Sequence, residues 1–137
     1  MPDTMIAATG GCLCGKVRYR AARVSPEVSE CHCGQCRRQS GHRYATVRAD
    51  TDGLEIEGED NITWFSRSAD ARDGFCSTCG SHLVWRGDGP DHVSLLAGSL
   101  DQPNRLAMAR HIFVDDKAGY YEIDDGLPCY AGYDRPL

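Results

Sequence analysis

The chain lacks the long runs that mark several classes of protein. Within its 137 residues no stretch is apolar for long enough to span a bilayer, and no basic run occurs. The net charge is −5, so we expect neither a nucleic-acid partner nor a membrane. Residues 1–9 have no positive segment followed by an apolar stretch, which argues against a secretory signal and favours a cytoplasmic protein.

Repeats, low-complexity tracts and linkers are also missing, so residues 1–137 are expected to form a single domain. Short β-prone segments separated by glycine, proline and aspartate turns predict a mainly β fold of antiparallel strands, as a sandwich or an irregular barrel. The predicted strands are 16–20, 44–48, 54–57, 62–66, 82–86, 92–97 and 110–114. One short helix is expected at 34–39, and four aromatic side chains are expected in the core: Trp64, Phe65, Phe75 and Trp85.

The chain is rich in cysteine, with eight residues of this type. Seven of them lie in three tight clusters: Cys12 and Cys14; Cys31, Cys33 and Cys36; Cys76 and Cys79. Cysteines so close in sequence bridge one another poorly, and the same spacing is typical of metal ligands. Without a secretory signal, a reducing compartment and metal binding are favoured over disulfides.

Four thiolates complete a tetrahedral zinc site, so seven leave a second site with three protein ligands and an open position. The Cys76–Cys79 spacing predicts a tight turn in which Gly80 supplies a positive φ. On an extended segment the side chains of Cys12 and Cys14 leave the same face, as do those of Cys31 and Cys33. His32 would then point away from the central cluster and is not expected to be a ligand.

Two other groupings fit the same residues. Cys12, Cys14, Cys31 and Cys33 could form the closed site, with Cys36, Cys76 and Cys79 in the other. Alternatively, His42 or Cys129 could complete a second closed site.

An open three-thiolate site suits a particular chemistry. Three thiolates make zinc a weak Lewis acid whose natural fourth ligand is a further sulfur. A substrate thiol bound there would be held as the nucleophilic thiolate.

The sequence closely resembles the glutathione-dependent formaldehyde-activating enzyme family, whose domain is shared with centromere protein V. The matching segments are 11–15, 31–41, 75–80, 97–101 and 125–128. The resemblance implies the Mss4-like β fold, organised around zinc. It implies one structural zinc on Cys12, Cys14, Cys76 and Cys79, and a catalytic zinc on Cys31, Cys33 and Cys36. With three protein ligands, the catalytic zinc is expected to be held less tightly than the structural one. The implied activity is that of a carbon–sulfur lyase that joins glutathione and formaldehyde to S-(hydroxymethyl)glutathione.

The chain departs from this family at His42, where a small residue is common, and at Tyr120-Tyr121, where a tryptophan-containing segment is expected. Cys129 lies outside the ligand set and is expected to be a partly buried apolar filler. Arg37, Arg38 and Arg43 flank the central cluster and could pair with the carboxylates of glutathione. The alternative function is a zinc-ribbon-like binding module whose zinc is only structural.

Overall fold

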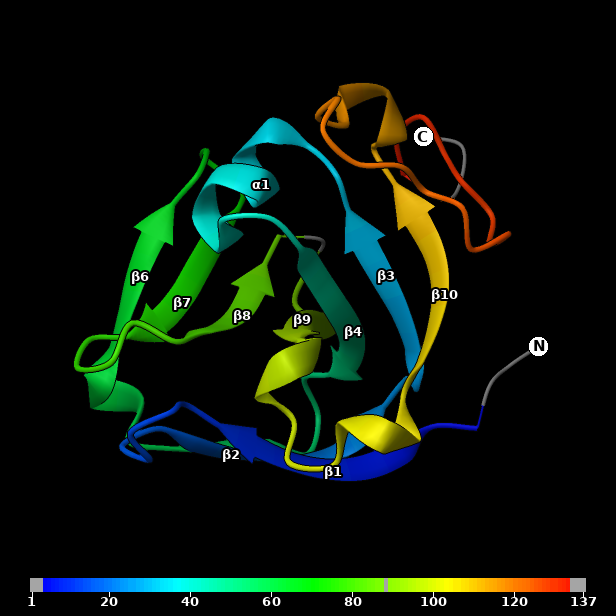
Figure 1. Ribbon diagram of the computed structural model, residues 1–137. Coiled ribbons are helices and arrows are strands. Elements are labelled where there is room, and N and C mark those ends of the chain that lie inside the picture. Colours follow the sequence, from blue (N-terminus) through cyan, green and yellow to red (C-terminus); the bar gives the residue numbers. More distant parts are fainter. Residues whose placement is uncertain (1–3, 88, 134–137) are drawn as a thin grey trace.

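A ten-stranded sheet dominates the computed structural model, which describes residues 4–87 and 89–133 (Figure 1). Its main path is β1-β2-β4-β9-β8-β7-β6, with β5 paired to β2, and with β3 joining β4 to β10. The strands are β1 Ile6–Gly11, β2 Arg18–Val24, β3 Glu27–Cys31, β4 Tyr44–Asp50, β5 Leu54–Glu57, β6 Ile62–Ser66, β7 Arg72–Cys76, β8 His82–Arg86, β9 His92–Leu96 and β10 Ala107–Ile112.

Helical structure is limited to short segments. The α-helix of the described residues is α1, Gly34–Ser40, and their 3-10 turns are η1 Glu59–Asn61, η2 Ala97–Ser99, η3 Pro103–Arg105 and η4 Val114–Asp116. The helix α1 begins where the Cys33 Sγ accepts the Cys36 N–H, and it ends at Gly41, whose φ of 86° needs a residue without Cβ. Among the described residues no helix is long and apolar enough to cross a membrane.

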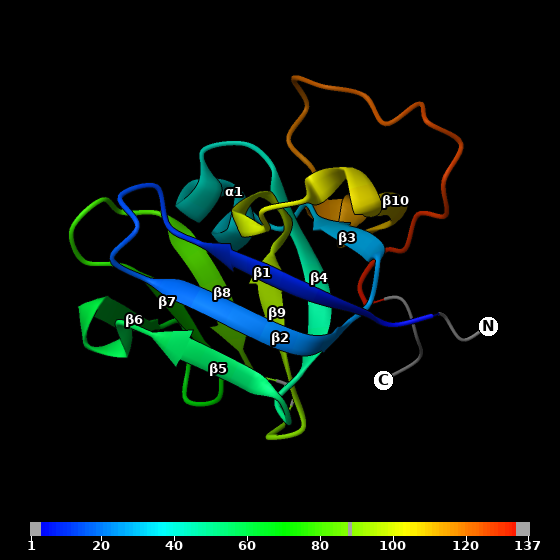
Figure 2. The same cartoon turned by 90° about the horizontal axis from the view of Figure 1, so that it is seen from below.

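The core lies between two layers of strands. β1, β2 and β5 form one layer, which crosses over the strands of the larger part of the sheet (Figure 2). Tyr19, Ala21 and Val24 of β2 belong to the core, together with alternate residues of β4 and β9 and with the consecutive Leu83 and Val84 of β8. The most deeply buried members of this cluster include Val24, Val47, Leu83, Val84 and Leu95.

The same alternation gives the sheet a second, polar face. In β4, Val47 and Ala49 belong to the core, whereas Tyr44, Thr46 and Arg48 line a cleft on the other face. In β3, Ser29 and Cys31 face the cleft, and Glu30 lies buried behind them. One face of β4 therefore packs in the core, and its other face lines the cleft next to the central cysteines.

The mainly β fold class expected from the sequence is confirmed, and all seven predicted strands overlap strands of the structure. Three strands were missed, namely β1, β3 and β7, because they carry the small or charged residues of Ala7–Gly11, Glu27–Cys31 and Arg72–Gly74. One pairing differs from the antiparallel expectation, since β10 runs parallel to β3. Of the four aromatic side chains expected in the core, Trp64 packs against it. The expectation was wrong for the other three: Phe65 is 55% exposed on the edge strand β6, Trp85 lines the cleft, and Phe75 is half-buried outside the core cluster.

Candidate metal centres

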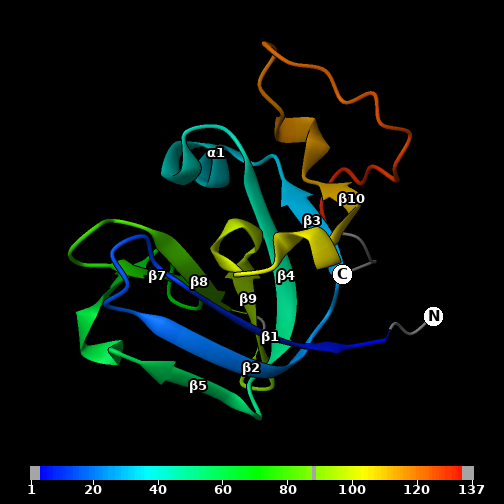
Figure 3. The same cartoon turned by 60° about the horizontal axis from the view of Figure 1, so that its bottom comes forward.

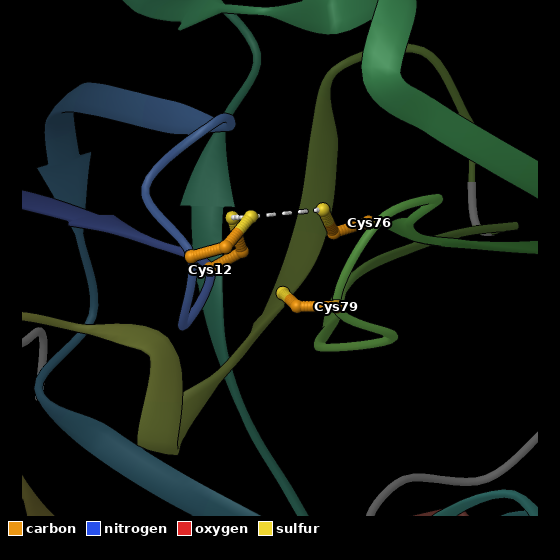
Figure 4. A group of neighbouring side chains, drawn as sticks. Cys12, Cys76 and Cys79 are labelled. Atoms are coloured by element: carbon orange, nitrogen blue, oxygen red, sulfur yellow. Dashed lines mark hydrogen bonds between the residues drawn. The ribbon is translucent and has the colours of Figure 1, made fainter.

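Four cysteines distant in sequence converge beside the β1–β2 connection. The ligand atoms of Cys12, Cys14, Cys76 and Cys79 all lie within 4.8 Å of one another. The Cys12 and Cys14 sulfurs are 3.6 Å apart, and the Cys14 and Cys76 sulfurs are 3.7 Å apart. Sulfurs of a tetrahedral zinc site with Zn–S bonds of about 2.3 Å are separated by about 3.8 Å. The four thiols therefore fit a closed zinc site (Figure 4).

Tight turns aim these thiols. Gly80, with a φ of 80°, follows Cys79, and its N–H donates to the Cys76 carbonyl, as the knuckle spacing predicted. Cys12 and Cys14 lie in a turn after β1, with the Gly15 N–H donating to the Cys12 carbonyl. The extended segment expected for this pair was therefore wrong, although both sulfurs still face one point. This cluster ties the β1–β2 connection to the β7–β8 turn.

A second group of thiols lies at the end of β3. The ligand atoms of Cys31, Cys33 and Cys36 lie within 4.8 Å of one another. Cys31 is the last residue of β3, Cys33 caps α1, and Cys36 is buried in the first turn of that helix. Cys31 and Cys33 are only partly buried, so the group is reachable from the cleft.

Contacts among the three thiols shift their pKa values in opposite directions. The hydrogen bonds from Cys31 and Cys36 lower the pKa of the Cys33 thiol to about 2. Hydrogen bonds with Cys33 and Cys36 raise the pKa of Cys31 far above its usual value. Three thiolates can coexist at this spacing only beside a cation, which is the electrostatic condition that a zinc ion would satisfy.

A largely buried arginine, Arg67, adds a positive charge beside the three thiols. Arg67 donates to the Cys36 Sγ at 3.4 Å and pairs with Asp73 at 2.6 Å. Asp73 is fully buried and also accepts from the Tyr44 hydroxyl at 2.8 Å and the His82 ring at 2.9 Å. Although burial raises the pKa of Asp73, the hydrogen bonds from His82, Arg67 and Tyr44 outweigh it and lower the pKa. Neither Arg67 nor Asp73 was identified from the sequence.

A cleft of about 700 Å³ opens beside the three thiols. Its walls come from β3, β4, β9, β10 and the start of α1, and its charged lining residues are Arg48, Arg67, Arg110, Glu27 and Asp116. Arg110 pairs with Glu27, which also lines the cleft. The exposed guanidinium of Arg48 has no hydrogen-bond or ion-pair partner among the residues that the structure describes. The cleft size is within the range of small-molecule sites.

His32 lies behind the three thiols, as expected from its place between Cys31 and Cys33. It is 2% exposed, and burial lowers the pKa of its ring. Its ring nitrogens bond the Tyr121 hydroxyl at 2.5 Å and the His111 ring at 2.9 Å. Together with Glu30 these two histidines form a third close group of ligand atoms, within 4.8 Å of one another.

The two residues considered as a fourth ligand lie elsewhere. His42 bonds the Tyr120 hydroxyl at 2.7 Å, and Cys129 is next to the Tyr130–His111 backbone pairing. Neither belongs to the Cys31, Cys33 and Cys36 group among residues 4–87 and 89–133. The expectation that Cys129 is partly buried was wrong, because it is exposed. Arg43 pairs with Glu30 at 2.6 Å, so that arginine is already occupied by a carboxylate of the protein.

Fold and clusters together define a mainly β protein with two cysteine groups suited to metal ions, one of four thiols and one of three. The sequence matches over residues 7–116 the family described as glutathione-dependent formaldehyde-activating enzyme, and the chain belongs to this family.

Three similar proteins illustrate the match. One is a Halomonas elongata protein with the name "Putative glutathione-dependent formaldehyde-activating enzyme", 29% identical over 90% of this chain and 87% of the relative. Another is an uncharacterized lyase of Schizosaccharomyces pombe, 24% identical over 83% of each chain. A crystal structure of a Rhodobacter sphaeroides protein superposes with a TM-score of 0.61 at 22% identity, covering 88% of this chain and 98% of that one. This last likeness shows the fold alone.

Proposed function

We propose that this protein is a zinc-dependent carbon–sulfur lyase that forms and breaks the adduct of a small thiol with a small aldehyde. Within the family the pair would be glutathione and formaldehyde, and the product S-(hydroxymethyl)glutathione. The observation that carries the proposal is the three-thiol group of Cys31, Cys33 and Cys36 beside a cleft large enough for a tripeptide. In this assignment Cys12, Cys14, Cys76 and Cys79 hold a zinc with a structural role.

A zinc ion on the three thiolates would supply a soft Lewis acid with one open position, which favours a substrate thiol in its deprotonated form. In synthesis the sulfur lone pair attacks the aldehyde carbon, a C–S bond forms, and the carbonyl π electrons move to oxygen, which takes up a proton. In the lyase direction these changes reverse. We assign the proton to solvent, because the Tyr44 hydroxyl in the cleft already donates to Asp73.

The chain's own residues would balance charge and bind the substrate. Arg67 places a positive charge against Cys36, which offsets the excess negative charge of three thiolates and a fourth sulfur. Arg48 is the candidate carboxylate partner. It lies four residues along β4 from Tyr44, the neighbour of Cys31, or about 13 Å along the strand. An extended tripeptide reaches roughly 10 Å, and the arginine side chain spans the remainder.

The test compares two cysteine variants by exchange NMR with labelled formaldehyde, because the thiol adduct also forms without a catalyst. Cys33→Ser should keep its fold and one of two zinc ions and lose the accelerated exchange. Cys129→Ser is the matched control, since this thiol is outside both clusters, and should exchange like the wild type. Retained acceleration in Cys33→Ser would contradict the role of the three-thiol site and leave the zinc-ribbon-like binding module as the better account. The cytoplasmic location stays a prediction from cysteine usage.

A further inference from the structure

A continuous line of hydrogen bonds runs behind the three-thiol site. It joins Tyr121, His32, His111 and Asp125, a set that we call the back-face latch. The contacts are 2.5 Å from the Tyr121 hydroxyl to His32 Nδ1, 2.9 Å from His32 Nε2 to His111 Nδ1, and 2.8 Å from His111 Nε2 to the Asp125 carboxylate. Both imidazoles are 2% exposed.

Hydrogen-bonding capacity fixes one end of this line. The Asp125 carboxylate can only accept, so His111 Nε2–H donates to it. The other ring nitrogens bond each other and the Tyr121 hydroxyl, and Glu30 Oε1 lies 3.6 Å from His111 Nδ1. Each ring nitrogen of the latch therefore has a partner, and these contacts hold both rings in one orientation.

The ion pair of Glu30 with Arg43 argues against a metal ion at Glu30, His32 and His111. Glu30, His32 and His111 offer a two-histidine, one-carboxylate set that resembles a metal site. However, Glu30 presents both oxygens to the Arg43 guanidinium, at 2.6 and 2.8 Å, so a cation already neutralises it. With His32 and His111 bonded to each other, the cluster is complete without a metal ion.

The latch connects the C-terminal segment to the metal-binding loop. Residues 117–133 loop out beside β10 (Figure 3). They return to it through backbone bonds from the His111 N–H to Pro128 and from the Tyr130 N–H to His111. This segment supplies both ends of the latch, Tyr121 and Asp125. Since His32 stands between Cys31 and Cys33, fixing its ring on one face fixes the two thiols on the other.

We propose that the back-face latch sets the metal affinity of the Cys31, Cys33 and Cys36 site, with His32 as the positioning residue. The proposal rests on the proposed function only in taking these thiols to be metal ligands. Outer partners that orient metal ligands change affinity by about 10- to 100-fold. Because the latch acts through the backbone, we expect the low end, about tenfold. The four-cysteine site has no contact with the latch among the described residues and should keep its affinity.

The test uses cadmium NMR with chelator competition, since a metal with four sulfur ligands resonates apart from one with three. Tyr121→Phe removes one hydroxyl and keeps the ring, and Asp125→Ala changes an exposed side chain, so neither substitution should prevent folding. Both substitutions should lower the cadmium affinity of the three-sulfur site about tenfold, as read from the loss of its signal to chelator. The affinity of the four-sulfur site should stay unchanged. Tyr19→Phe is the matched control, because it also removes a tyrosine hydroxyl from a hydrogen bond. That hydroxyl bonds Ser99 at 2.6 Å, and neither Tyr19 nor Ser99 belongs to the latch.

Equal three-sulfur affinity in wild type and Tyr121→Phe would overturn the proposal, as would an equal loss in Tyr19→Phe. A third equivalent of metal that disappears in Asp125→Ala would overturn it too, in favour of a metal ion on Glu30, His32 and His111. If the wild-type protein gives only the four-sulfur signal, the three thiols do not bind metal. That result would contradict the proposed function and, with it, the latch proposal. The outcomes therefore separate failure of the latch from failure of the site.

Discussion

Arg67 offers the sharpest prediction, because one side chain joins the three-thiol site to a buried carboxylate. Its side chain is 9% exposed, and that of Asp73 is 0% exposed. Removing one partner of a buried ion pair costs about 3–5 kcal/mol, because the other charge is left uncompensated. Asp73 would keep its bonds from Tyr44 and His82, so Arg67→Met should lower the free energy of unfolding by about 3 kcal/mol.

The same variant should weaken metal binding at the neighbouring thiols. The Arg67–Cys36 contact of 3.4 Å is a hydrogen bond to a charged group, and such a bond contributes about 2 kcal/mol. Its loss predicts roughly 30-fold weaker metal binding at Cys31, Cys33 and Cys36. Stability is read from urea unfolding of metal-loaded protein, and metal affinity from chelator competition.

Two controls isolate the cause. Arg20→Met removes an exposed pair with Glu55 at 3.6 Å, and its effect on unfolding should be below about 0.5 kcal/mol. Adding Asp73→Asn to Arg67→Met should restore part of the stability, since no buried charge then lacks a partner. The reasoning about this charge network is refuted if the free energy of unfolding of Arg67→Met lies within about 0.5 kcal/mol of the wild-type value and its metal affinity is unchanged.

Three further predictions follow from single features. Gly80→Ala should destabilise by roughly 1–2 kcal/mol through its positive φ alone, since a Cβ there meets nothing within 4 Å; Gly119→Ala, equally open but without positive φ, should change urea unfolding little. The lowered pKa of Asp73 means that its stabilisation is present above pH 3.8, its ordinary pKa, and is lost as pH falls through the lower folded value. The stability gap between wild type and Asp73→Asn should therefore shrink below about pH 4 in urea titrations, and a constant gap would count against the carboxylate. Arg48→Met should raise KM for glutathione about tenfold with kcat little changed, and leave 2-mercaptoethanol, which has no carboxylate, unaffected; equal effects on both thiols would exclude carboxylate binding.

The sequence predicted the local features of this molecule better than the distant ones. Turn residues and β-branched runs located strands such as β5 and β6 to the residue. The knuckle at Cys76 and Cys79 was equally readable, because a two-residue gap and a following glycine allow few conformations. The strands β1 and β3 escaped notice, since their small and charged residues acquire strand structure from their neighbours in the sheet.

The surroundings of the three thiols could not be read from the sequence for a related reason. Asp73 and Arg67 are 31 or more residues beyond Cys36, and only the pairing of β6, β7 and β8 brings them to it. The sequence pointed to Arg43 as a carboxylate partner, but β3 places Glu30 against it. One usable signal was the histidine between Cys31 and Cys33: strand alternation put its ring on the far face, which is where the latch lies.

The most direct test of the central claim is zinc-edge X-ray absorption of the zinc-loaded protein with and without glutathione. Seven cysteine thiols in two groups predict seven zinc–sulfur bonds per chain, with a lighter atom completing the second zinc. Glutathione should raise the sulfur count to eight and change one zinc only. An unchanged spectrum, or a second site already closed by four protein ligands, would contradict the claim that Cys31, Cys33 and Cys36 leave a place for the sulfur of a substrate.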